Sequence, residues 1–208
     1  ERLVEVQTRI EQQEIQCEPT MHVVGKPFDV IVRTADSVNT HLIVMGRGRC
    51  CEGGHPGLGN TTSRVLHRTP HPVIAVAPGA TGVIRRILCP VDGSSPSARG
   101  LHNAIQLAQR LKARLTVLTV LVDFAPVGIG RQFPDMTRIA SEYEQMEREQ
   151  FEQFIHGFDF GDVDWDKEVH HGHAATEVVR LATSAGYDLV VMGSTGRSGL
   201  PRVLLGST

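Results

Sequence analysis

The chain has 208 residues, of which 40% are hydrophobic and 21% are charged, and its formal net charge is −2 at pH 7. This composition is that of a globular protein with enough apolar residues to bury a core. The near-neutral charge gives no electrostatic reason to expect a nucleic-acid partner, and no apolar run is long enough to suggest a membrane partner.

The first part of the chain contains an apolar run that ends in a glycine loop. The run Leu42–Met45 is followed by Gly46-Arg47-Gly48-Arg49. The segment His71–Val76 is the last apolar run before a break at Pro78–Gly82, which the Gly and Pro residues mark as a linker. We expect His71–Val76 to form a strand at a sheet edge, where proteins usually cover or pair the exposed backbone.

The next elements predict a strand, a helix and a second strand. Arg86–Asp92 reads as a short buried strand that ends in Asp, and Leu115–Val122 is nearly all apolar and β-branched. Between them, Ser94–Ala98 begins a helix with an N-cap residue and a Pro in the first turn. The apolar stripe of that helix is Leu101, Ala104, Ile105, Ala108 and Leu111.

The remaining elements continue the alternation. We expect a loop at 123–134, a helix at 136–154 with a charged solvent face, a strand at 163–170, a helix at 174–184 and a strand at 188–192. Buried strands that alternate with helices imply an α/β fold, an open parallel twisted sheet with helices on both faces. Ligands of such Rossmann-like sheets bind beyond the carboxyl ends of the strands, where the strand order reverses.

A glycine-rich loop follows the last of these strands. Gly193-Ser194-Thr195-Gly196-Arg197 leads into Gly206-Ser207-Thr208, where a helix N-cap is expected. Gly193 and Gly196 allow positive φ and close approach of the backbone to a ligand. Backbone N–H groups and a helix dipole favour an anion, so this loop indicates a phosphate site.

The two glycine loops belong to an internal repeat. One offset of 147 residues relates Gly25 to Gly172, Gly46 to Gly193 and Gly59 to Gly206, with no insertion between them. Repeated anchors at one long offset indicate a duplicated small domain. We therefore expect a first domain at 1–77, a linker at 78–84 and a second domain at 85–208. Neither copy is complete by this comparison, since the first lacks a counterpart of residues 85–147 and the second lacks its last helix and strand.

These motifs resemble those of the universal stress protein family. The resemblance rests on Pro90-Val91-Asp92, on Gly172-His173-Ala174, and on Met192–Arg197 with Gly206-Ser207. It implies two tandem domains of the adenine nucleotide alpha hydrolase-like type. It also implies ATP, with or without Mg²⁺, as the ligand of the second domain, with the Asp near the adenine and the glycine loop around the ribose and phosphates. The residues that it implies for nucleotide binding are Pro90, Val91, Asp92, Leu121, Met192, Gly193, Ser194, Thr195, Gly196, Arg197, Gly206, Ser207 and Thr208.

The first copy departs from this pattern. Arg49 stands where the second copy has Gly196, and Gly59 is followed by Asn60 instead of Ser or Thr. Asn60 can still cap a helix, but Arg49 places a long side chain where backbone should approach a ligand. We expect a degenerate first site made of Gly46, Arg47, Arg49, Gly59 and Asn60, with its arginines as alternative anion ligands.

No metal site is expected from the histidines or cysteines. Adjacent His170 and His171 on a strand point to opposite faces, and Cys17, Cys50, Cys51 and Cys89 lack metal-site spacing. Free cysteines are typical of a reducing cytoplasm.

Three functions remain open at this point. The first is a nucleotide-responsive stress or regulatory module that is not an enzyme, since no catalytic motif is present. The second is slow ATP hydrolysis or adenylyl transfer through Asp92 and Ser207, and the third is a nucleotide-free interaction module. Asp92 itself has two interpretations, as an acceptor for the adenine amino group or as part of a turn and helix cap. The resemblance also implies a dimer, or an intramolecular pseudo-dimer, through the terminal strand His71–Val76.

Overall fold

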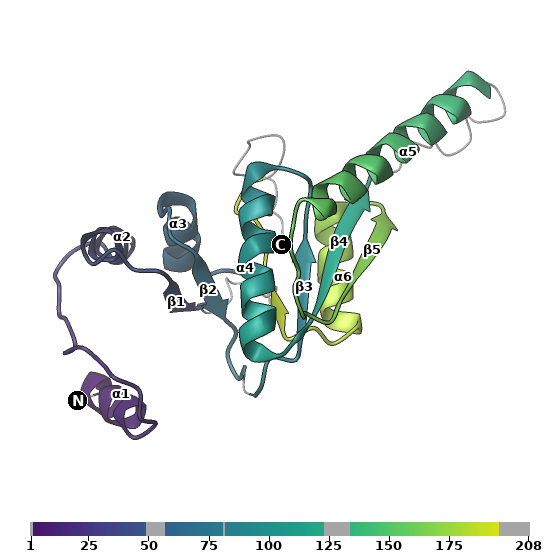
Figure 1. Cartoon of the computed structure of the whole chain (residues 1–208). Helices are drawn as coiled ribbons and strands as arrows, with labels where there is room; N and C mark the ends of the chain where they lie inside the picture. Colours follow the sequence, from purple (N-terminus) through teal and green to yellow (C-terminus); the bar gives the residue numbers. More distant parts are fainter. Residues whose placement is uncertain (1, 49–56, 81, 123–133, 196–208) are drawn as a thin grey trace. The chain divides into compact units, whose positions relative to one another are not determined.

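The computed structural model describes residues 2–48, 57–80, 82–122 and 134–195. They form two compact units (Figure 1). Of these residues, the first unit contains 2–48 and 58–78, and the second contains 57, 79–80, 82–122 and 134–195. In the described part of the chain, no helix combines the length and the apolarity that crossing a membrane requires.

The first unit pairs two short strands beneath two helices. Its elements are α1 (Arg2–Glu11), α2 (Pro27–Ser37), β1 (Ile43–Gly46), α3 (Asn60–Arg68) and β2 (Val73–Val76). The strands β1 and β2 run parallel, with Ile43 opposite Val73 and Gly46 opposite Val76. One face of this pair buries Ile43 against Phe28 and Ala35 of α2 and Val65 of α3. On the other face Val44 is 63% exposed.

The second unit has the expected parallel α/β architecture. Its elements are β3 (Arg86–Pro90), α4 (Ser95–Leu111), β4 (Arg114–Leu121), α5 (Pro134–His156), β5 (Trp165–His171), α6 (Ala174–Ser184) and β6 (Leu189–Val190). The strand order is β5-β4-β3-β6 and every pairing is parallel. The order therefore reverses at β3, which lies between β4 and β6.

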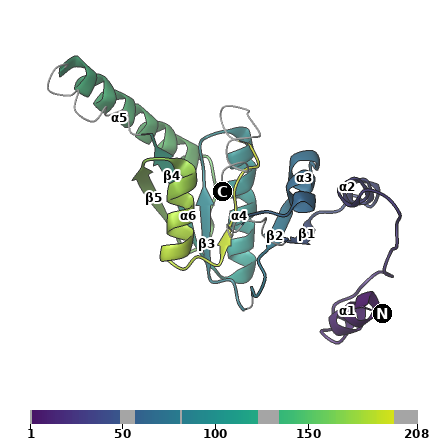
Figure 2. The same cartoon turned by 180° about the vertical axis from the view of Figure 1, so that it is seen from behind.

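Helices cover both faces of this sheet. The helices α4 and α5 pack on one face, over Ile87, Cys89, Leu115 and Val117, and α6 packs on the other, over Leu88 and Leu118. Figures 1 and 2 show these two sides in turn. This division follows from right-handed crossovers, because the first two connections run in one direction across the sheet and the third returns.

Most of the predicted apolar stripe of α4 is buried. Leu101, Ala104, Ile105 and Ala108 are at most 5% exposed, whereas Leu111, the last residue of the stripe, is 38% exposed. The helix ends at Leu111, and Lys112 takes a left-handed conformation (φ 53°) that turns the chain towards β4. Leu111 consequently lies at the margin of the core.

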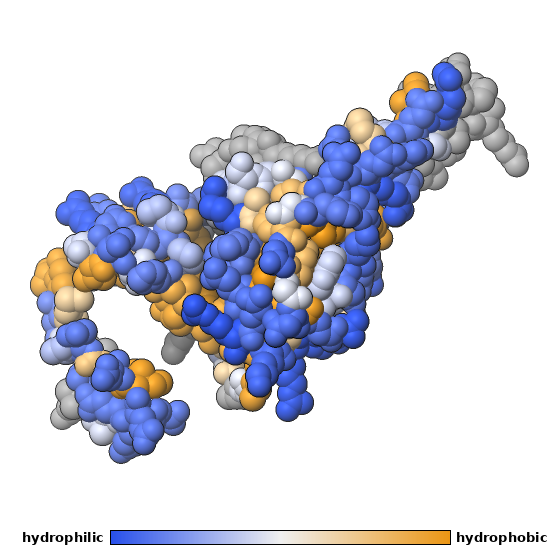
Figure 3. All heavy atoms as spheres, in the orientation of Figure 1, coloured by the Kyte–Doolittle hydropathy of each residue, from blue (hydrophilic) through white to orange (hydrophobic). Residues whose placement is uncertain are grey.

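The helix α5 is longer than predicted and extends beyond the sheet (Figure 1). Its end at Phe151 and Ile155 is buried in the core. Figure 3 shows a mainly hydrophilic surface along its projecting part, as expected for a charged solvent face. The predicted loop before it falls at 123–133, outside the described residues.

The repeat is visible in the elements themselves. Helix α2 begins at Pro27 and ends at Ser37, and α6 begins at Ala174 and ends at Ser184, which is the 147-residue offset at both ends. The strand β1 corresponds to residues 190–193, where β6 ends. The two units are thus copies of one α/β design.

Candidate functional site

The candidate site lies at the carboxyl edge of the second sheet. Because the strands are parallel, β3, β4 and β5 end at the same edge, with Pro90 beside Leu118 and Leu121 beside His171. Backbone hydrogen bonds hold the chain as it leaves each strand. The N–H of Val91 donates to the Leu118 carbonyl (2.8 Å), that of Val191 to Leu88 (2.9 Å) and that of Gly172 to Leu121 (2.9 Å).

Asp92 and the start of α4 form one hydrogen-bonded turn. Asp92 Oδ1 accepts from the Ser94 N–H (3.0 Å) and from the Ser94 hydroxyl (2.6 Å). Ser94 is the N-cap of α4, and its Oγ accepts from the Ser97 N–H (3.3 Å). The Asp92 N–H donates to Ser97 Oγ (3.4 Å), which in turn donates to the Ser94 carbonyl (2.9 Å). These hydrogen bonds support the interpretation of Asp92 as part of a turn and helix cap.

The start of the glycine loop, at Gly193, lies directly on the first turns of α4. A Cβ on Gly193 would lie 2.8 Å from the Pro96 carbonyl carbon and 2.9 Å from the Ser97 nitrogen. Gly193 does not use the positive φ that glycine allows. The lack of a side chain is needed there because the helix backbone occupies the space.

A second glycine on the helix side completes this contact. Gly100, in the interior of α4, would place a Cβ 3.1 Å from the Gly193 nitrogen and 3.1 Å from the Met192 carbonyl carbon. The sequence interpretation missed Gly100. A glycine within an otherwise regular amphipathic helix was the available signal, because glycine there is unfavourable unless another backbone comes close.

The predicted site residues differ in exposure. Val91 and Leu121 are buried, so their side chains belong to the protein interior, whereas Met192 is 39% exposed at the edge. Ser194 is exposed and Thr195 is half-buried. The predictions for Gly196, Arg197, Gly206, Ser207 and Thr208 fall outside the described residues.

The first copy shows how the corresponding loop meets its helix. The Arg47 N–H donates to the Val76 carbonyl (2.7 Å), and the Gly59 N–H donates to the Arg47 carbonyl (2.6 Å). Gly48 has φ +90°, and a Cβ on it would lie 2.8 Å from the Gly59 Cα. Two backbone segments are thus in contact at the entrance of the loop.

The cap prediction for the first copy is wrong by one residue. Gly59, with extended backbone angles, is the N-cap of α3, and Asn60 is the first helical residue. The Gly59 carbonyl accepts from the Ser63 N–H (2.9 Å), so the helical bonding starts at Gly59. Gly46 ends β1 and would find nothing within 4 Å of a Cβ, unlike its counterpart Gly193. Arg49 lies outside the described residues.

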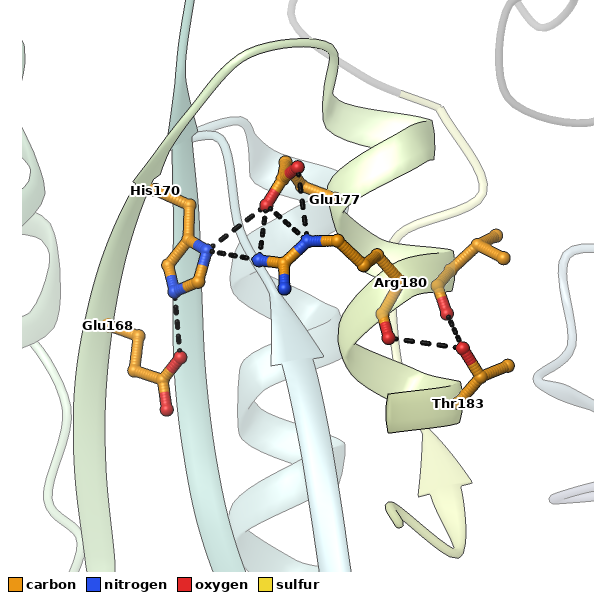
Figure 4. A network of polar contacts seen from close by, with 6 residues as sticks. Glu168, His170, Glu177, Arg180 and Thr183 are labelled. Atoms are coloured by element: carbon orange, nitrogen blue, oxygen red, sulfur yellow. Dashed lines mark hydrogen bonds and ion pairs between the residues drawn. The ribbon is translucent and has the colours of Figure 1, made fainter. Parts of the chain in front are cut away.

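The two strand histidines point to opposite faces, as predicted. His171 Nε2 lies 3.4 Å from Glu144 Oε1 of α5. His170 faces α6 and joins a polar network (Figure 4). Its Nε2 lies 2.9 Å from Glu168 Oε2 and its Nδ1 lies 3.1 Å from Glu177 Oε2.

Arg180 completes this network, since its Nη2 donates to Glu177 Oε2 (2.7 Å). The hydrogen bond from Arg180, and then that from His170, lower the pKa of the Glu177 carboxyl. The network joins the edge strand β5 to α6 by polar contacts. Among residues 2–48, 57–80, 82–122 and 134–195, no three His, Cys, Asp or Glu side chains cluster in a way that could hold a metal ion.

Comparison with known proteins identifies the family to which the chain is similar. The model of the universal stress protein family matches residues 1–77 and 84–208. A universal stress protein of Methanocaldococcus jannaschii is 31% identical over 127 residues, which are 59% of this chain and 72% of that protein.

Two solved structures share the fold over most of the chain. A universal stress protein from Archaeoglobus fulgidus has a TM-score of 0.64 and 20% identity, and the match covers 90% of this chain and 63% of that one. A Pseudomonas aeruginosa protein assigned to the universal stress proteins has a TM-score of 0.65 and 18% identity, over 95% of this chain and 69% of that one. The chain therefore belongs to the universal stress protein family, which it matches in two tandem stretches.

Proposed function

We propose that the second unit binds ATP at the carboxyl edge of its sheet and that the chain acts as a nucleotide-responsive stress or regulatory module. The observation that carries this proposal is the seating of the Gly193 loop on the start of α4, next to the Asp92 turn. The loop follows β6 and the turn follows β3, so both lie at the point where the strand order reverses. That is where parallel α/β sheets bind their ligands.

Each part of the nucleotide has a candidate partner. Asp92 is the proposed acceptor for the adenine amino group, with Pro90, Val91 and Leu121 beside the base. Since Val91 and Leu121 are buried, we assign contact with the base to their backbone. Met192–Arg197 and Gly206–Thr208 would surround the ribose and phosphates, with Mg²⁺ as an optional companion of the phosphates.

The exposure of two residues at the start of the loop is compatible with this ligand. Ser194 is exposed and Met192 lies partly in solvent. Small side chains and a hydroxyl beside a helix start suit phosphate oxygens, which accept hydrogen bonds from backbone and side-chain donors.

The proposal assigns the first unit no nucleotide. Its loop carries Arg47 and Arg49 at the positions of Ser194 and Gly196. In the described part of this unit, β2 pairs only with β1, and we propose that its other edge pairs with a second chain or with the second copy. The free cysteines Cys17 and Cys89 suit a reducing cytoplasm.

Calorimetric titration with ATP tests the number of sites. We expect one site per chain and a gain in unfolding free energy of about 2.7 kcal/mol at a ligand concentration near 100 times Kd. Thr208→Ala and Ser207→Ala should weaken binding, while Asn60→Ala in the first copy should not. Two equivalent sites, or no heat of binding with no ligand-induced stabilisation, would contradict the proposal.

The same sample separates binding from catalysis. Bound ATP recovered intact by mass spectrometry after heat denaturation supports a binding module. Steady release of phosphate above that of a Gly206 variant would favour a hydrolase, and a burst of pyrophosphate would favour adenylyl transfer.

A further inference from the structure

We propose that Gly100 is the positioning residue of the ATP site, because it lets the Met192–Gly193 backbone lie directly on α4. Gly100 is in the interior of a 17-residue helix, where glycine is less favourable than alanine. It is also buried. A glycine at this position of α4 therefore needs a local explanation. The inference rests on the proposed ATP site.

The reason is a contact between two backbones without side chains between them. A Cβ on Gly100 would lie 3.1 Å from the Gly193 nitrogen, 3.1 Å from the Met192 carbonyl carbon and 3.5 Å from the Met192 Cα. From the other side, Gly193 lies against Pro96 and Ser97, four and three residues earlier on the same helix. The loop thus rests on successive turns of α4, and a methyl group at position 100 would push it away by a few tenths of an ångström.

The same stretch of helix holds Asp92. Ser97 accepts from the Asp92 N–H through Oγ, and its backbone nitrogen would lie 2.9 Å from a Cβ on Gly193. The start of α4 therefore fixes the distance between the residue proposed for the adenine and the loop proposed for the phosphates. A displacement of a few tenths of an ångström matters for binding because donors and acceptors on both sides must meet one ligand.

Packing alone and positioning predict different results for Gly100→Ala. If Gly100 only packs, the alanine changes stability and leaves the ATP affinity of the folded protein intact. If it positions the loop, the helix gains from alanine while the loop is displaced. The Kd for ATP should then rise at least fivefold, with little change in the denaturant midpoint.

The experiment measures the Kd for ATP and the amide hydrogen exchange of Met192–Thr195 in the wild type, in Gly100→Ala and in Gly46→Ala. Gly46→Ala is a matched control, since a Cβ there meets nothing within 4 Å. We expect weaker binding and faster exchange in Gly100→Ala alone. An unchanged Kd in a folded Gly100→Ala protein would overturn the inference.

The experiment also has a defined result if the wild type does not bind ATP or if Gly100→Ala does not fold. If the wild type does not bind ATP, the proposed function fails, and the exchange rates alone then judge whether Gly100 holds the loop in place. If Gly100→Ala does not fold, the wild type is compared with and without ATP. Slower exchange of both Ser97–Leu101 and Met192–Thr195 supports the coupling, and slower exchange of the loop alone overturns it.

Discussion

Asp92 combines a structural contact with a proposed binding role. One of its carboxylate oxygens accepts two hydrogen bonds from Ser94, which is itself the cap of α4. The turn fixes the side chain at the carboxyl edge of β3. A carboxylate held in this way is pre-oriented, so a ligand that it binds would not have to order it first.

Replacing Asp92 separates these roles. If Asp92 accepts the adenine amino group, Asp92→Ala should weaken ATP binding by about 1.5 to 3 kcal/mol, as for a hydrogen bond to a charged group. The preference for ATP over GTP should fall with it. Ser94→Ala removes the cap of α4 and one of the two bonds to Asp92, so it should cost about 1 kcal/mol of stability and lower the base preference less than Asp92→Ala does. An unchanged preference in Asp92→Ala would assign Asp92 to the turn alone.

Asp188 provides a pH-dependent contact between two strand starts. Its Oδ2 accepts from the N–H groups of Arg85 (2.8 Å) and Arg86 (3.0 Å). The bond from Arg85, and then that from Arg86, lower the pKa of the Asp188 carboxyl. A lowered pKa in the folded state means that the contact stabilises fully above the unfolded pKa, about 3.9 for Asp. The stabilisation is lost as the pH falls through the folded value.

Denaturant midpoints of the wild type and of Asp188→Asn test this contact. The wild type should be more stable at pH 7, and the difference should shrink as the pH falls below about 4. Asp162→Asn changes an exposed turn residue in the same unit and should show no such trend. A difference between wild type and Asp188→Asn that is constant from pH 7 to pH 3 would contradict the assignment.

At the scale of elements, α4 is central to the second unit, because it covers the sheet and also supports the glycine loop. Leu101 is fully buried in its apolar stripe and Leu111 is 38% exposed at its end. Leu101→Ala should cost about 2 to 5 kcal/mol of unfolding free energy. Leu111→Ala should cost clearly less, and urea unfolding measures both. Equal losses would show that the burial difference along α4 does not hold in solution.

The order and positions of the helices and strands could largely be predicted from the sequence, but the contacts between them could not. The apolar runs at Leu115–Val122 and the cap at Ser94 locate β4 and the start of α4, because strand burial and capping are local patterns. The 147-residue offset likewise predicts α2 from α6. By contrast, the contact of Gly100 with Gly193 joins residues far apart in the chain, and neither apolar periodicity nor residue type identifies which backbones meet. The N-cap Gly59 likewise donates a hydrogen bond to the Arg47 carbonyl, a contact that the sequence does not display.

At the scale of the whole molecule, the two copies of the repeat bury corresponding strand residues to different extents. Leu189 and Val191 pack against the core beneath α4 and α5, whereas their counterparts Leu42 and Val44 are 40% and 63% exposed. The exposed sheet face of the first unit is therefore apolar, since Val44 lies opposite Ile74 of β2. An exposed apolar strand is a surface on which chains associate.

Ile74→Lys tests this association. If β2 pairs with another chain, sedimentation of the wild type should show a dimer, and the lysine should shift it towards monomer because a charge on an edge strand opposes pairing. Val38→Lys is the control, because Val38 is also exposed but lies at the end of α2. A wild type that is monomeric at all concentrations, with Ile74→Lys unaltered in stability, would exclude the interface.

The closure between Gly48 and Gly59 has a consequence for the chain between them. Both ends of that segment are held by the hydrogen bond from Gly59 to Arg47 and by the contact of the two glycines. The free energy of closing a loop with fixed ends rises only with the logarithm of its length, by about 0.6 kcal/mol for each doubling. Residues could therefore be added to or removed from this segment at little cost in stability, as long as the contact of the two glycines at its base is kept.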